Sequence, residues 1–144
     1  MNEMDDEFLE VNDLDWFALY IDGFLAHFAT GGQGFVPDSI RRSISEYELV
    51  YDFFHALNSG FEYDVVEENL PIFKTLSQRE RYLQSFVFMA ERGVFSYDFS
   101  VSGYRLIAAP KSGRNISDLP VGIKGGMFRL SLSSCDDIKY IEDF

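Results

Sequence analysis

Few residues of this sequence are of the types that carry out chemistry, and they are widely separated. His27 lies in a run that alternates like a strand, and His55 lies beside Phe54 in a helical pattern. The single cysteine, Cys135, could act as a nucleophile with either histidine as base, but nothing local supports that pairing. Neither histidine has a second histidine or a cysteine at metal-ligand spacing. We therefore expect structural histidines, no catalytic residues, no metal site and no cofactor, and hence no enzyme.

Two glycine-containing loops could bind an anion. The run Thr-Gly-Gly-Gln-Gly at 30–34 precedes a helical pattern, but it lacks the lysine and hydroxyl of a P-loop, and Asp38 would repel a phosphate. A tight turn that needs glycine is the favoured interpretation. Lys111, Arg114 and Lys124 form a basic loop region that could bind an anion or neutralise the acidic half of the chain.

Acidity is the strongest chemical feature of the sequence. The chain has 144 residues, with 24 acidic and 12 basic residues, and a formal net charge of −12. Residues 1–70 contain 16 of these acids but only two bases, Arg41 and Arg42, so few of the acids are expected to have a neutralising neighbour. This balance excludes a general nucleic-acid binder and a protein attracted to anionic membranes. A sequence half with almost only negative charge instead attracts a cationic partner and raises the rate at which the two associate.

The acids that we expect to be exposed form three clusters along this half. As candidate partner-binding residues we nominate Asp5, Asp6, Glu7, Glu46, Glu48, Asp52, Asp64, Glu67 and Glu68. Trp16, by contrast, is assigned to the core because its neighbours alternate like a buried strand.

The length fits a single domain over 1–144, with loose ends expected at 1–13 and 136–144. At 47% hydrophobic residues the chain can build a core without a disulfide, which one cysteine could not form anyway. The N-terminus has no basic or apolar segment of a signal peptide, and no apolar run reaches the length of a membrane span. These features predict a cytoplasmic protein.

The first half of the chain predicts a hairpin and a helix. Aromatic and β-branched runs at 15–22 and 24–29 flank Asp22-Gly23, which is a strong hairpin signal. From Asp38 onward, apolar residues at steps of three and four predict one helix, capped by Asp38 or Ser39 and ended by the sequence at 58–60. Its apolar face would consist of Ile40, Ile44, Tyr47, Tyr51, Phe54 and Leu57.

The second half predicts another helix and three strands. After an irregular connection at 61–76, Ser77 and Glu80 form a capping box for a helix at 78–92. Alternating runs at 94–99 and 104–109 predict a second hairpin, and a loop at 110–126 leads to a strand at 127–132. The tail from 136 is a short strand or a half-ordered end. The order ββ-α-α-βββ predicts an α+β domain, an antiparallel sheet with two helices packed on it.

One segment of the chain resembles a known family. Asp-Trp-Phe-Ala at 15–18, Asp22-Gly23, Ala-His-Phe-Ala-Thr-Gly-Gly at 26–32 and Val36-Pro37 resemble the N-terminal segment of small immunity proteins from bacterial polymorphic-toxin and contact-dependent growth inhibition systems. The similarity covers about residues 14–37 and carries no catalytic signature. It implies a cytosolic protein that neutralises one cognate toxin C-terminal domain, commonly a nuclease. Nucleases tend to present basic clefts, which an acidic protein can occupy.

Two other functions fit the sequence. An acidic adaptor or nucleic-acid mimic would bind several basic cellular proteins and would share the salt dependence of an immunity protein. A small ligand-binding domain or enzyme would use the glycine-rich loops, with His27 or the basic loop facing a pocket. The oligomeric state, the chemistry of the toxin and the choice between its active site and an exosite stay open.

Overall fold

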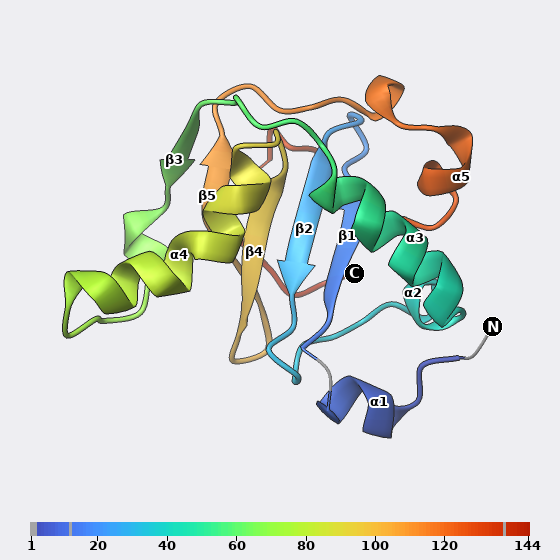
Figure 1. Ribbon diagram of the computed structural model, residues 1–144, viewed down its shortest axis with the longest axis horizontal. Coiled ribbons are helices and arrows are strands. Elements are labelled where there is room, and N and C mark those ends of the chain that lie inside the picture. Colours follow the sequence, from blue (N-terminus) through green and yellow to red (C-terminus); the bar gives the residue numbers. More distant parts are fainter. Residues whose placement is uncertain (1–2, 12, 137) are drawn as a thin grey trace.

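A mixed seven-stranded sheet forms the centre of the computed structural model, which describes residues 3–11, 13–136 and 138–144 (Figure 1). The strands are β1 (Asp15–Leu19), β2 (Leu25–Ala29), β3 (Tyr63–Val65), β4 (Phe95–Ser100), β5 (Gly103–Pro110), β6 (Phe128–Arg129) and β7 (Tyr140–Ile141). The helices are α1 (Asp6–Val11), α2 (Asp38–Arg41), α3 (Ile44–His55), α4 (Leu76–Ala90) and α5 (Val121–Lys124), with 3₁₀ turns η1 (Glu67–Asn69) and η2 (Ile116–Asp118). The α+β class is therefore confirmed, with α3 and α4 as its two substantial helices.

Both predicted hairpins are present. β1 and β2 pair antiparallel with Trp16 opposite Phe28, and Gly23 in the connection has a φ of +87°, a conformation that favours glycine. β4 and β5 form the second antiparallel pair, with Phe99 opposite Tyr104. Local turn chemistry was sufficient to predict these two units.

The prediction of a purely antiparallel sheet is wrong, because two strand pairs are parallel. The strand order is β3-β5-β4-β2-β1-β6, with β7 pairing with β5. β4 runs parallel to β2, and β6 runs parallel to β1. The long connection from β2 through α3 and α4 returns the chain to the end of the sheet where β2 began, as a parallel pairing requires.

Both helices begin elsewhere than predicted. The expected single helix from Asp38 is divided into α2 and α3, because Ser43 is extended and its hydroxyl accepts a hydrogen bond from the Glu46 amide at 3.3 Å. α4 is capped by Thr75, whose hydroxyl accepts from the Gln78 amide, so the predicted capping box at Ser77 is wrong. In both cases a hydroxyl residue with extended backbone makes the cap.

The connections hold more structure than expected. The segment 61–76 contains β3 and η1, the loop at 110–126 contains η2 and α5, and only Phe128–Arg129 of the run 127–132 is a strand. The tail includes β7, which is the strand alternative for that segment. The prediction of loose termini stays a prediction, and residues 1–2, 12 and 137 lie outside the described residues.

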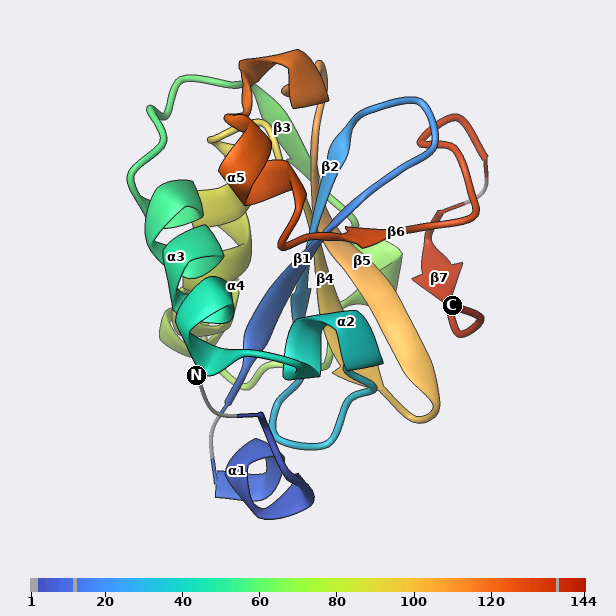
Figure 2. The same ribbon diagram turned by 90° about the vertical axis from the view of Figure 1, so that its right-hand side faces the viewer.

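The sheet separates two packed layers. α3 and α4 cover one face (Figures 1 and 2), while the C-terminal Phe144 packs on the other face, against Trp16 and Phe28. On the C-terminal side, Trp16 is fully buried in an aromatic cluster with Phe28 and Tyr104, which confirms its assignment to the core. Under the helices, Phe17 stacks on Phe54 of α3 with centroids 4.1 Å apart. Within the described ranges, no helix combines the length and the apolar composition that crossing a membrane requires.

The orientation of α3 differs from the expected one. Its buried residues are Val50 and Phe54, whereas Tyr47 and Tyr51 are only half-buried. The predicted apolar stripe is therefore partly wrong. α3 is rotated about its axis, so that Val50 and Phe54 face the sheet and the two tyrosines lie at the margin of this buried face. This rotation leaves aromatic side chains available on the surface, beside the acidic residues of the same helix.

Candidate functional site

A pocket of about 490 Å³ lies between the N-terminal segment and α3. Its walls combine apolar and aromatic side chains with three carboxylates. They consist of Phe8, Asp13, Leu14, Ile44, Tyr47, Glu48, Tyr51 and Asp52. We call this the α1–α3 pocket. Its volume falls within the range of roughly 300–1,000 Å³ that is typical of ligand sites.

The carboxylates of the α1–α3 pocket have no basic partner. Among the described residues, no ion pair involves Asp13, Glu48 or Asp52. The walls of this pocket contain no lysine or arginine, whereas four other pockets of the described chain each include one. Negative charge at this site is therefore left for a ligand or for solvent to neutralise.

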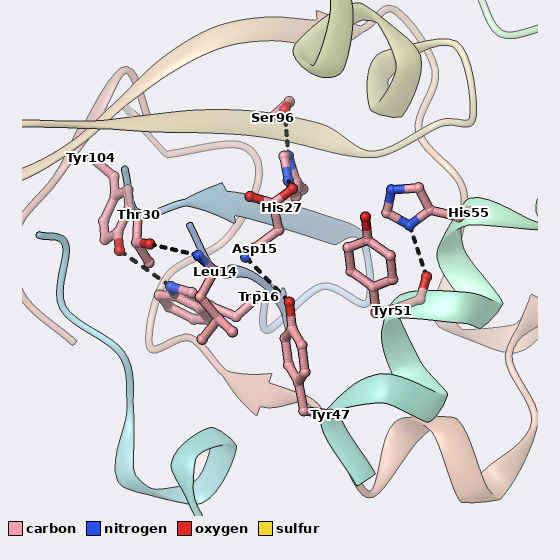
Figure 3. A network of polar contacts seen from close by, with 10 residues as sticks. All are labelled: Leu14, Asp15, Trp16, His27, Thr30, Tyr47, Tyr51, His55, Ser96 and Tyr104. Atoms are coloured by element: carbon pink, nitrogen blue, oxygen red, sulfur yellow. Dashed lines mark hydrogen bonds and ion pairs between the residues drawn. The ribbon is translucent and has the colours of Figure 1, made fainter. Parts of the chain in front are cut away.

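An aromatic ladder runs from the pocket along α3 toward α4. Tyr47 and Tyr51 have ring centroids 6.1 Å apart, and Tyr51 stacks on His55 at 3.9 Å. His55 stacks in turn on Phe88 of α4, and the Arg92 guanidinium lies 3.5 Å from the centroid of that ring. Figure 3 shows Tyr51 and His55 side by side. Spacing of four residues on a helix places the first three rings in one row.

The negative potential extends over the tyrosines of this ladder. Burial raises the pKa of the Tyr51 hydroxyl, and the carboxylates of Asp15 and Asp52 raise it further. Burial also raises the pKa of Tyr47 well above its ordinary value; the hydrogen bond from the Asp15 amide lowers it, and the carboxylates of Asp15 and Glu48 raise it. Carboxylates therefore raise the pKa of both tyrosines. We call the surface formed by Asp13, Asp15, Glu48, Asp52, Tyr47 and Tyr51 the acidic face.

Asp15 also connects the acidic face to a buried polar network (Figure 3). His27 is buried in β2 with its Nδ1 2.6 Å from the Ser96 hydroxyl. Its Nε2 lies 3.2 Å from Asp15 Oδ2 in a contact that lacks hydrogen-bond geometry. Nδ1 and the Ser96 hydroxyl share a hydrogen bond in which either group can be the donor, depending on the histidine tautomer.

This serine, histidine and aspartate resemble a hydrolase triad only in residue type. A nucleophilic serine must reach its substrate, yet Ser96 is 0% exposed and His27 is 1% exposed. Asp15, at the outer end of this network, has a side chain that is 25% exposed and that also lines a cleft of about 290 Å³ between α3 and α4. The structural role expected for His27 fits this enclosure.

Two of the three predicted acidic clusters are partly used inside the molecule. The Asp5 carboxylate accepts a hydrogen bond from the Phe8 amide at the start of α1, and Asp6 pairs with Arg41 at 2.9 Å. Glu67 forms a two-point contact with Arg79 at 2.8 and 2.7 Å, and Glu68 pairs with Lys139 at 3.1 Å. Asp6, Glu67 and Glu68 thus have basic partners that come from distant parts of the chain rather than from near neighbours. Glu7 and Asp64 are exposed.

The α3 cluster divides between two sides of the helix. Glu48 and Asp52 line the α1–α3 pocket, whereas Glu46 is exposed but does not line it. The sequence-based nominations missed the other pocket residues, including Phe8, Asp13, Tyr47 and Tyr51. The available signal was the interleaving of Tyr47 and Tyr51 with Glu48 and Asp52 on one predicted helix.

The other features singled out in the sequence have internal partners. In the loop at 30–34, the amides of Gly32 and Gly34 bond to Thr30, and Gly31 has a φ of +59°, so the tight turn is confirmed. Arg114 donates to the carbonyl oxygens of Arg92 and Asn58. Its guanidinium therefore connects two backbone segments and is not an anion-binding group. Cys135 is exposed, and no hydrogen bond between it and either histidine is found in the described part of the chain.

Asp98 on β4 provides a pH-dependent test of the layer beneath α4. Burial raises the pKa of Asp98, although the hydroxyl of Tyr82 donates to it at 2.6 Å. The folded state therefore binds this proton more tightly than the unfolded state. The contribution of Asp98 to stability is greatest below its unfolded pKa of about 3.9 and is lost as pH rises through its raised folded pKa. We expect Asp98→Asn to gain stability relative to the native protein between acidic and neutral pH.

Urea unfolding of both proteins over this pH range measures that change. Only the difference between the two proteins is used, so other titrating groups cancel. Asn at this position can still accept from Tyr82. A difference that does not vary with pH would contradict the raised pKa of Asp98.

The comparisons with known proteins give no assignment. Family models, curated proteins and solved structures all gave no match to this chain. Among the described residues, no group of three histidine, cysteine or acidic side chains is placed to hold a metal ion. Functional inference therefore depends on the geometry of the acidic face and on the resemblance of residues 14–37.

Proposed function

We propose that this protein is an immunity protein that binds and neutralises a cognate toxin domain, a basic nuclease in the simplest case, through its acidic face. The observation that carries the proposal is the α1–α3 pocket, where Asp13, Glu48 and Asp52 surround aromatic walls without a basic partner among the described residues. Aromatic side chains rimmed by unneutralised carboxylates suit a cationic protein surface.

The charge distribution supports a basic partner. Arg41, Arg79 and Lys139 pair with acids outside the acidic face, and among the described residues its only ion-pair contact is that of Asp15 with the buried His27. Carboxylates that become desolvated against Lys or Arg can couple by roughly 1.5–7 kcal/mol, while pairs at the rim mainly affect the association rate. Nucleases present such basic residues because they must attract a polyanion.

The toxin-neutralising part of the proposal depends on the resemblance. The resembling segment at 14–37 contains β1 and β2, whose strands lie inside the sheet. This segment therefore supports a shared scaffold, and the contact residues must come from the acidic face. The alternative, an acidic adaptor or nucleic-acid mimic, would use the same face on several partners.

Capture from a lysate of the source cell, with the tagged full-length chain at low and moderate salt, tests this function. We expect one stoichiometric partner with a toxin domain whose activity the purified chain inhibits. Binding should slow as salt screens the acidic face. Capture of many nucleic-acid-binding proteins, all lost together as salt rises, would favour the mimic. A captured toxin whose activity is unaffected would contradict neutralisation.

A further inference from the structure

We propose that the α1–α3 pocket is a socket for one arginine side chain of the protein partner. This inference rests on the proposed function, since it names the residue type by which the basic partner is anchored. The pocket offers Tyr47 and Tyr51 as ring faces and Glu48 and Asp52 as acceptors, with Phe8 closing the side formed by α1.

The socket is built to be rigid on both sides. On the α1 side, Arg41 donates to the Met4 carbonyl oxygen and pairs with Asp6, which holds the segment before Phe8 against the body. Met4 is itself 1% exposed. On the α3 side, the hydroxyl of Tyr47 accepts a hydrogen bond from the Asp15 amide at 3.3 Å. Walls that are already in place reduce the ordering cost of binding.

The charge of the pocket selects a cation. Three carboxylates line it, and no lysine or arginine does. The carboxylates of Asp15, Glu48 and Asp52 also act on the tyrosine hydroxyls, which places their potential at the aromatic walls. An anionic or purely apolar ligand would leave these carboxylates desolvated without compensation.

The aromatic ladder favours arginine over lysine. A guanidinium is planar, stacks on aromatic faces and donates in a fork that matches a carboxylate, whereas an ammonium is a strongly hydrated point charge. The chain already uses this contact at the other end of the same ladder, where Arg92 lies over Phe88. Arg114 makes a second such contact, 5.0 Å from the centroid of the Phe61 ring. In the described part of the chain, no arginine or lysine lies over the rings of Tyr47 and Tyr51 at the opposite end of the ladder.

Titration of the full-length protein with blocked arginine, N-acetyl-arginine methylamide, tests the socket by amide NMR at constant ionic strength. We expect saturable shifts concentrated at 44–55, and an affinity at least about threefold above that of the matching lysine derivative, a modest stacking preference. Equal or tighter binding of the lysine derivative would overturn the choice of arginine. Shifts spread over all acidic surfaces would overturn the socket.

Two double variants, each of which removes two negative charges, are compared; one changes the pocket and the other is its control. Glu48→Gln with Asp52→Asn should weaken arginine binding at least about tenfold, because each amide keeps one accepting oxygen but loses the negative charge and the second oxygen that a guanidinium fork engages. Glu62→Gln with Glu80→Gln removes two exposed acids that do not line the pocket and should change the affinity for arginine less than about twofold. Equal losses in both variants would show a general field rather than a socket.

A separate variant tests whether the ring of Tyr51 contributes to the preference for arginine. Tyr51→Leu keeps an apolar side chain but removes the ring, so the preference for arginine over lysine should disappear. A preserved preference would overturn the role of the ladder. The arginine titration needs no toxin, so it tests the socket separately from the proposed function. Absence of arginine binding would overturn the socket even if a captured toxin is neutralised. Arginine binding would support the socket even if no toxin is captured.

Discussion

Trp16→Ala is expected to lower the free energy of unfolding by about 4 kcal/mol, the scale of a fully buried large aromatic residue replaced by alanine. The indole is 0% exposed, stacks on Phe28 with centroids 4.3 Å apart, and meets the edges of Tyr104 and Phe144. Its Nε1–H donates to the Tyr104 hydroxyl at 3.2 Å. Removing it therefore leaves a cavity and also takes a donor from a buried hydroxyl.

Urea unfolding followed by circular dichroism measures this loss, since Trp16 is the only tryptophan and its fluorescence disappears with the substitution. Native domains are stable by about 5–15 kcal/mol, so the expected loss is about a quarter to four fifths of that free energy. Ile72→Ala is the matched control, because Ile72 is 100% exposed and should change stability by less than about 0.5 kcal/mol. A loss below about 1 kcal/mol for Trp16→Ala would contradict the packing of this cluster.

The local parts of the fold could be predicted, and the long-range parts could not. Asp22-Gly23 predicts its hairpin because the turn and both strands are adjacent in sequence. The parallel pairing of β2 with β4 depends instead on how the chain returns after two helices, which no local pattern specifies. Ser43 and Asp38 are both good cap residues, so sequence cannot decide which of them begins the main helix.

The residues of the acidic face could be predicted only in part, because they too depend on long-range packing. A helical period gives the angle between side chains but not the rotation of the helix on its sheet. Tyr47 and Tyr51 belong to the apolar stripe by spacing, yet Val50 and Phe54 are the residues of α3 that are buried. Glu67 and Glu68 looked free until the fold brought Arg79 and Lys139 to them. The sequence showed that this half of the chain is acidic. Only the fold showed which of its acids pair with a base and which do not.

Glu48→Lys combined with Asp52→Lys is expected to weaken binding to the basic partner by at least about 100-fold, or about 2.8 kcal/mol. Both carboxylates line the α1–α3 pocket, so each reversal removes an attraction and adds a repulsion at the centre of the acidic face. Both side chains are exposed, so stability should change by less than about 0.5 kcal/mol per site. Surface plasmon resonance with the captured partner measures the affinity, and urea unfolding verifies the fold.

A second reversal pair separates this site from net charge. Glu62→Lys with Glu80→Lys changes the charge of the chain equally, but both residues lie outside the pocket, and we expect an affinity within about threefold of the native value. Added salt should slow association of the native chain and of this control alike. Equal losses for both pairs would assign binding to the general field of the chain. Unchanged binding when all three predicted acidic clusters are reversed would contradict an electrostatic mechanism altogether, because the acidic face would then contribute nothing that its charge explains.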